Sequence, residues 1–221
     1  MSPDEILKTL YDETLVGNAP RVLELTKEGL ASGMTPESML FDALIPSLEE
    51  VGARFERGDF FVPEMLIAGR AMAGAMEVLR PLLAETGVET VGRFVMGTVQ
   101  GDVHDIGKNL VNIMLEGAGF HVIDLGVQVS PDKVIAGIHE HKPDIVGFSA
   151  FLTTTMPMFK ANINALQKAG LRDQVIVMVG GAPVTQEYAD AVGADGYAAD
   201  AATAVRKAKE LLAARRAAVG V

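Results

Sequence analysis

The feature that most constrains the fold is an alternation of short apolar runs with helical segments in the C-terminal part of the chain. Between residues 93 and 214, five apolar runs each precede a segment whose apolar residues recur at helical spacing. This alternation predicts five βα units forming a parallel doubly wound sheet. The predicted strands are 93–99, 121–125, 144–148, 175–179 and 196–198, and the predicted helices are 106–117, 131–141, 156–169, 185–192 and 201–214.

Residues 1 to about 86 carry only helical patterns, separated by short breaks. Ser2 and Glu5 form a capping box at the start of the first helix, and the second helix follows near residue 19. A third helix opens at Thr35 and a fourth at Pro63. Four amphipathic helices with short loops predict an antiparallel bundle.

The predicted fold class is therefore α/β, with an N-terminal four-helix bundle cap followed by a flavodoxin-like doubly wound five-stranded parallel sheet. Two glycines and no helical pattern mark residues 86–92 as the linker. We expect residues 1–88 to form the helical-bundle domain and residues 89–221 to form the Rossmann-like domain.

Charge and composition narrow the classes of function. The net charge of -10 argues against a nucleic-acid partner, because neutralising phosphates requires clustered Lys and Arg. The sequence has no cysteine, which excludes disulfides, thiolate metal ligands and a cysteine nucleophile. The N-terminus lacks an apolar signal region, and no apolar stretch is long enough to span a bilayer. We expect a cytoplasmic protein without a membrane partner.

The first loop of the sheet domain carries the main candidate site. Asp102 and His104 follow a predicted strand and precede a predicted helix. In extended chain, side chains two residues apart point the same way, so the carboxylate can hold the imidazole in one tautomer. Gly107 then leaves room for a bulky ligand near the backbone. The alternative is a histidine hydrogen-bonded only within its own loop, because short motifs often match by chance.

Topology gives this loop two companions. In the strand order 2-1-3-4-5, ligands bind beyond the carboxyl ends of the strands, at the switch between strands one and three. The segment Ser149 to Thr155 follows strand three, and Gly180-Gly181 follows strand four. All three segments should therefore converge on one edge of the sheet.

The three motifs together resemble the signature of cobalamin-binding domains. They are Asp102-x-His104-x-x-Gly107, the run beginning at Ser149, and Gly180-Gly181. The resemblance is strongest to methionine synthase and to the small corrinoid proteins of methyltransferase systems. It implies a cobalamin or related corrinoid cofactor, with His104 as the lower axial ligand of cobalt in place of the cofactor's own nucleotide base.

The resemblance also implies roles for neighbouring residues. Asp102 would accept the other ring N–H of His104, and Thr155 would donate its hydroxyl to that carboxylate. Ser149 and Thr153 would hydrogen-bond the displaced nucleotide tail, although Ser and Thr also favour turns for local reasons. The remaining residues of the implied cofactor site are Val103, Asp105, Gly107, Gly180, Gly181 and Ala201.

The helical part resembles the cap of the same family. The match covers Val51-Gly52-x-x-Phe55-x-x-Gly58-x-x-Phe61-x-Pro63. It implies that Phe55 and Val62 shield a methyl group bound to cobalt. Packing beneath the second domain would explain this apolar loop equally well.

The implied function is a methyl carrier. A substrate-specific methyltransferase would place a methyl group on Co(I), and a second methyltransferase would move it from methyl-Co(III) to tetrahydrofolate or a thiol. A reductive activase is a further expected partner, and the chain itself is expected to be a corrinoid subunit with no catalytic residues of its own. Lys108 and Asn109 are expected to face solvent or the amide groups of the cofactor. Two alternatives remain open: a cobalamin-binding sensor or regulatory protein, and the small subunit of an adenosylcobalamin-dependent mutase.

Overall fold

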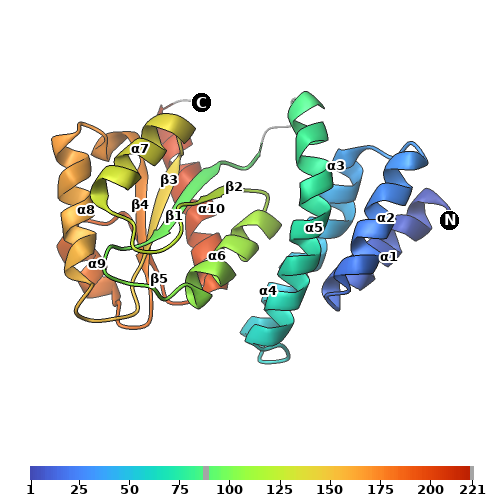
Figure 1. The fold of residues 1–221 in the computed structure, drawn as a ribbon, viewed down its shortest axis with the longest axis horizontal. Helices are drawn as coiled ribbons and strands as arrows, with labels where there is room; N and C mark the ends of the chain where they lie inside the picture. The colour runs from blue at the N-terminus through green and yellow to red at the C-terminus, as the bar shows by residue number, and fades with distance from the viewer. Residues whose placement is uncertain (87–89, 220–221) are drawn as a thin grey trace. The chain divides into compact units, whose positions relative to one another are not determined.

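The computed structural model describes residues 1–86 and 90–219, which form two compact units. The helical unit consists mainly of the residues up to 86, and the sheet unit begins at residue 90 (Figure 1). The predicted domain boundary between residues 88 and 89 lies outside the described residues. Each unit is described by itself below.

The helical unit has the predicted helices, and side-chain caps start the first and the third of them. Ser2 and Glu5 form the predicted capping box, and Thr35 caps the third helix by accepting from Ser38 N–H. Leu10, Leu25 and Met72 are among the side chains buried between the helices. The elements are α1 (Pro3–Leu15), α2 (Ala19–Ala31), α3 (Pro36–Met39), the π-helical segment η1 (Leu40–Leu44), α4 (Ile45–Glu56) and α5 (Val62–Thr86).

The predicted third helix is a continuous run of α3, η1 and α4 with a π turn in its middle. Ile45 N–H donates to the Leu40 carbonyl, five residues back instead of four. Pro46 follows directly and has no N–H to offer the carbonyl of Asp42. The proline therefore provides a physical reason for the local change in helix type, which the sequence pattern did not predict.

The sheet unit contains five parallel strands in the order β2-β1-β3-β4-β5, as predicted. Strand β1 pairs with both β2 and β3, and five of its six residues are buried. This burial explains the continuous apolar run in its sequence. The strands are β1 (Arg93–Thr98), β2 (His121–Asp124), β3 (Ile145–Ser149), β4 (Ile176–Gly180) and β5 (Gly196–Ala198).

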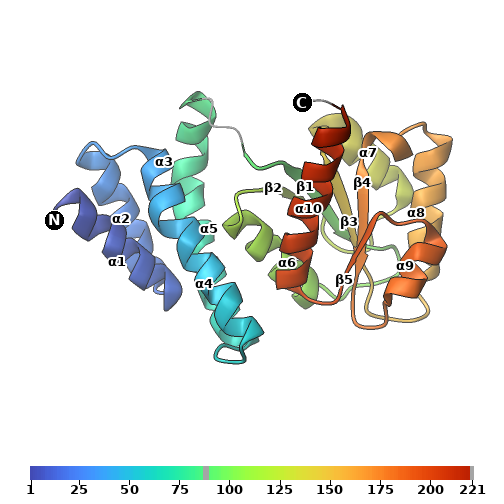
Figure 2. The ribbon, with the colours of Figure 1, turned by 180° about the vertical axis from the view of Figure 1, so that it is seen from behind.

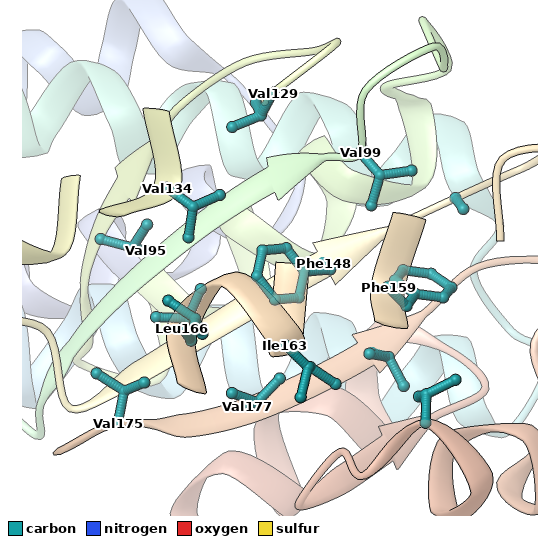
Figure 3. Packing of buried hydrophobic residues seen from close by; sticks show 14 of the residues in the cluster. Val95, Val99, Val129, Val134, Phe148, Phe159, Ile163, Leu166, Val175 and Val177 are labelled. Carbon is teal, nitrogen blue, oxygen red and sulfur yellow. The ribbon is translucent and has the colours of Figure 1, made fainter. Parts of the chain in front are cut away.

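Helices cover both faces of this sheet. Figures 1 and 2 show α6 and α10 on one face and α7, α8 and α9 on the other. Val95, Phe148 and Val177 belong to a hydrophobic core that also contains residues of α8, and Figure 3 shows this core from close by. The helices are α6 (Ile106–Gly117), α7 (Pro131–His141), α8 (Pro157–Lys168), the short 3-10 helix η2 (Arg172–Gln174), α9 (Gln186–Val192) and α10 (Ala201–Val219).

Because all strands are parallel, the loops after β1, β2, β3 and β4 lie at one edge of the sheet. Backbone hydrogen bonds tie these loops to one another and to the strand ends. Gln128 N–H in the loop after β2 donates to Asp102 O in the loop after β1, and Ala150 N–H donates to Gly180 O at the end of β4. The edge predicted to hold the site is therefore a connected set of loops.

Candidate functional site

Asp102 is the structural centre of the loop after β1. Its side chain is fully buried, and each carboxylate oxygen accepts several hydrogen bonds. Oδ1 accepts from the backbone N–H of His104 at 3.1 Å and lies 2.7 Å from its Nδ1. Oδ2 accepts from the N–H groups of Phe151 and Leu152 and from the hydroxyl of Thr155, at 2.8, 3.2 and 2.7 Å. One carboxylate thus joins the loops after β1 and β3.

These donors determine the charge of Asp102. Burial by itself would raise the pKa of the carboxyl group, but the hydrogen bonds from His104, Phe151 and Thr155 outweigh burial and hold the pKa well below its usual range. Asp102 is therefore ionised near neutral pH. An ionised carboxylate has no proton to donate, so the hydrogen bond with His104 requires the proton to be on Nδ1.

His104 is consequently held in the tautomer that leaves the lone pair of Nε2 available. Its side chain is 45% exposed, in contrast to the buried carboxylate behind it. The hydroxyl of Thr98 donates to the His104 carbonyl at 3.0 Å, which fixes the backbone as well. A neutral imidazole presented in this way is a good ligand for a transition metal.

Thr155 has two acceptors for one proton. Its Oγ1 lies 2.7 Å from Asp102 Oδ2 and 2.8 Å from the carbonyl oxygen of Leu152. The predicted hydrogen bond between Thr155 and Asp102 is thus present in the structure. Since the hydroxyl can turn between these acceptors, the carboxylate has a neighbour that adapts to a change in its charge.

The loop after β2 also supports the site. Gln128 N–H donates to the Asp102 carbonyl at 3.0 Å, and Gln128 adopts a left-handed backbone conformation with φ of 52°. Such a conformation is uncommon for a residue other than glycine, and strained backbone of this kind clusters at functional sites. No sequence pattern predicted this contact.

Apolar side chains are exposed around His104. In the described part of the sheet unit, the exposed large apolar residues all lie on the loops after β1, β2 and β3, or at the first residue of α6. Exposed apolar groups gathered at one place are typical of a binding surface. These residues are Val103, Ile106, Val127, Phe151 and Leu152.

Gly181 and Gly107 differ in whether the fold requires a glycine at their positions. A Cβ on Gly181 would lie 1.9 Å from the Ala150 carbonyl oxygen, and its φ is 126°, so the fold itself requires glycine there. A Cβ on Gly107 would meet nothing within 4 Å. Packing therefore does not explain Gly107, and the missing side chain leaves open surface at the start of α6.

Two other predicted site residues end strands instead of lying in loops. Ser149 is the last residue of β3 and Gly180 is the last residue of β4, where the two are paired. The prediction that both follow their strands was therefore wrong by one residue. A Cβ on Gly180 would lie 3.0 Å from the Ala198 carbonyl oxygen, which is a close contact with β5.

The remaining predicted residues differ in exposure. Asp105 and Thr153 are exposed, and the Asp105 carbonyl accepts from Asn109 N–H at the start of α6. Ala201 is only 3% exposed, so its side chain does not lie on an open surface. Phe55 and Val62 are partly buried residues of the helical unit, and their shielding role stays a prediction.

Lys108 corrects an interpretation of the sequence. We expected its side chain to face solvent or a cofactor, but it is 2% exposed. Its Nζ forms an ion pair with Asp124 at the end of β2 and donates to Asn109 Oδ1 at 2.6 Å. The lysine therefore ties α6 to β2, and a sequence pattern could not show this because its partner lies 16 residues away.

Within 1–86 and 90–219, no group of three or more His, Asp or Glu side chains is arranged to hold a metal ion. None of the helices described combines the length and the apolar character needed to cross a membrane.

Two family models match the sequence, and both describe a B12 binding domain. One matches residues 92–206, and the other matches residues 6–80. The matches together include most of the sheet unit and most of the helical unit.

Known proteins are similar over nearly the whole chain. A dimethylamine corrinoid protein of Methanosarcina barkeri is 43% identical over 214 residues, which cover 96% of this chain and 100% of that protein. A trimethylamine corrinoid protein of Methanosarcina acetivorans is 40% identical over 213 residues, which cover 96% of this chain and 99% of that protein.

A solved structure with a similar fold is a chain of the methanol:cobalamin methyltransferase complex of Methanosarcina barkeri. The TM-score is 0.84 at 29% identity, and the match covers 95% of this chain and 80% of that chain. A cobalamin-binding protein from Desulfitobacterium hafniense matches with a TM-score of 0.71 at 29% identity, over 92% of this chain and 97% of that chain.

Proposed function

Because the chain belongs to the B12-binding family, we propose that it is a corrinoid methyl carrier in which His104 is the protein's ligand to cobalt. The observation that carries the proposal is the half-exposed side chain of His104, whose Nδ1 is held by Asp102 so that Nε2 is left without a proton. A buried, ionised carboxylate holds this histidine in the tautomer that a metal requires.

The residues present fit a corrinoid. A corrinoid brings most of the ligands of its own metal, so the protein would need to provide only one donor. Nε2 of His104 would be that donor, and the exposed side chains on the neighbouring loops would offer apolar contacts to the cofactor. Open surface at Gly107 removes an obstacle to close approach of the ring.

The corrinoid supplies the cobalt that accepts and releases a methyl group. The chain's own residues orient and tune the ligand to this metal. Asp102 keeps the proton on Nδ1 of His104, and Thr155 hydrogen-bonds the other carboxylate oxygen. Held in this way, His104 would offer the lone pair of Nε2 to the metal in a fixed orientation.

The remaining site residues are proposed to contact the cofactor without binding the metal. Val103, Asp105 and Gly107 surround His104 in its loop, whereas Ser149, Thr153, Gly180, Gly181 and Ala201 are proposed to receive the nucleotide tail. Ala201 has the least support because its side chain is buried. Phe55 and Val62, which belong to the helical unit, are proposed to shield the methyl group.

The carrier role requires a methyltransferase partner, and a methyltransferase complex is among the similar structures. Full-length similarity to dimethylamine and trimethylamine corrinoid proteins favours a methylamine as the methyl source. We further propose a second methyltransferase that transfers the methyl group to tetrahydrofolate or a thiol. A reductive activase that restores Co(I) and a cytoplasmic location complete the proposal.

The test uses protein loaded with hydroxocobalamin and reduced to Co(I). It is mixed with the methyltransferases that serve the dimethylamine and trimethylamine corrinoid proteins, each with its amine, and with the methanol:cobalamin methyltransferase and methanol. We expect the absorption spectrum of methylated cobalt with one of them. Retained corrinoid that none methylates, although each methylates its own corrinoid protein in parallel, would contradict the carrier role while leaving corrinoid binding intact.

A further inference from the structure

The ring of Phe151 stacks on the ring of His104. Their centroids are 4.4 Å apart and their planes differ by 29°. Phe151 is 53% exposed, so the protein core holds its ring on one side at most. A large aromatic side chain on an exposed loop, lying flat on the residue that presents the free nitrogen, calls for an explanation beyond core packing.

The hydrogen bond to Asp102 leaves one freedom of the imidazole unrestrained. A single contact at Nδ1 fixes the direction of that N–H, but the ring can still swing about the line joining Nδ1 and Oδ1. Such a swing moves Nε2 sideways. A flat ring pressed against the imidazole face opposes this motion, and offset stacking of two aromatic rings is a favourable geometry.

The backbone of Phe151 connects the two contacts. Its N–H donates to Oδ2 of Asp102 at 2.8 Å, while its side chain covers His104. The residue therefore touches the imidazole directly and also holds the carboxylate that fixes Nδ1. A leucine at this position would have no flat face to offer to the imidazole.

We propose that Phe151 is a positioning residue that fixes the imidazole plane of His104 and thereby the direction of its Nε2 lone pair toward the bound corrinoid. The effect on cobalt binding rests on the proposed function, whereas the restraint on the ring exists in the protein without cofactor. The two parts can therefore be tested separately.

The first part is tested by NMR of the cofactor-free protein. A stacked phenyl ring shifts the ring protons of His104 upfield relative to those of the other three of the four histidines. Phe151→Leu is expected to abolish this shift and Phe151→Tyr to keep it. Leu152→Ala is the matched control. It removes the neighbouring apolar side chain but keeps the backbone N–H that Leu152 donates to Asp102, so we expect the His104 shift to stay. An unchanged His104 shift in Phe151→Leu would overturn the proposal.

The second part uses protein labelled with ¹⁵N-histidine, loaded with cobalamin and reduced to Co(II). The electron paramagnetic resonance signal then reports the fraction of cobalt bound to histidine nitrogen. Phe151→Leu is expected to lower this fraction and to weaken cobalamin binding about 10-fold, the lower end of the usual loss for a partner of a metal ligand. Phe151→Tyr should behave as the unmodified protein.

Unchanged affinity and histidine-bound fraction in Phe151→Leu would overturn the positioning role, whatever the NMR shift. If the unmodified protein itself retains no cobalamin, the proposed function fails instead. The NMR comparison of cofactor-free proteins still decides whether Phe151 restrains the histidine.

Discussion

Oγ1 of Thr155 lies 2.7 Å from Oδ2 of Asp102, although the two residues are 53 positions apart in the chain. The contact brings a hydroxyl from the turn after β3 onto the carboxylate after β1. Since Asp102 holds His104 with its other oxygen, the support of the histidine extends across two adjacent strands of the sheet.

Removing the Thr155 hydroxyl should destabilise the protein without cofactor. Thr155→Val keeps the shape of the side chain but takes a donor from a buried, ionised acceptor, so we expect a loss of about 1.5–3 kcal/mol in the free energy of unfolding. Urea denaturation measures this loss. Thr155→Ser should recover most of it.

Thr153→Val is the matched control, because Thr153 lies in the same turn but is exposed. We expect a change within about 0.5 kcal/mol. Equal losses in Thr155→Val and Thr153→Val would show that the hydroxyl contact with Asp102 has no special weight.

Asp102 should make stability depend on pH in acid. Its pKa in the folded protein lies below its ordinary value of 3.8, so the ionised carboxylate contributes stability that is complete above that value and is lost as pH falls toward the folded pKa. Asp102→Asn has no group to protonate. From about pH 4 to about pH 2, the difference in unfolding free energy between the two proteins should shrink by up to about 1.4 kcal/mol per pH unit. Parallel stability curves over this range would refute the assignment.

Two glycines of the site should respond oppositely to alanine. Gly181→Ala places a Cβ against the Ala150 carbonyl at a φ of 126°, so we expect a loss of more than about 2 kcal/mol or failure to fold. Gly107→Ala meets no atom and lies in a helix, so stability should stay equal or rise by up to about 1 kcal/mol. Thermal unfolding and cobalamin titration separate the two effects.

For Gly107→Ala we expect weaker cobalamin binding in spite of normal stability, because the side chain of the new alanine occupies surface that is open in the unmodified protein. Unchanged affinity in this variant would mean that the cofactor does not approach the start of α6.

Asp102 should support cobalt binding without being essential for it. Asp102→Ala frees the tautomer and orientation of His104, and loss of such a partner typically lowers affinity about 10–100-fold. Titration with hydroxocobalamin, followed by absorbance, measures the change. Asp173→Ala, at an exposed carboxylate in η2 before β4, is the control and should bind as the unmodified protein does. Equal affinities of all three proteins would remove Asp102 from the site.

The sequence predicted the sheet and the meeting of the candidate loops at one of its edges because both depend on local patterns. Buried parallel strands leave apolar runs, and parallel topology brings the loops of Asp102 and Thr155 to one edge. The stack of Phe151 on His104 was not predictable, because a side-chain orientation depends on packing between distant loops. Lys108 was misread for the same reason: a charged residue on a helix signals solvent unless its partner is known.

The helical unit shows a related difference. Caps such as Ser2 and Thr35 were predicted correctly because they involve residues three apart in sequence. The π segment at Leu40–Leu44 was missed although Pro46 stands beside it. Helical periodicity alone does not show how the chain accommodates a missing N–H.

The central claim, that His104 binds the cobalt of a corrinoid, is tested most directly on ¹⁵N-histidine-labelled protein. The protein is incubated with hydroxocobalamin, desalted and reduced to Co(II), beside His104→Ala. We expect retained corrinoid and a nitrogen splitting that changes from the ¹⁴N triplet to the ¹⁵N doublet, lost in His104→Ala. A folded protein that retains no corrinoid, or retains it with an unchanged ¹⁴N triplet, would contradict the account.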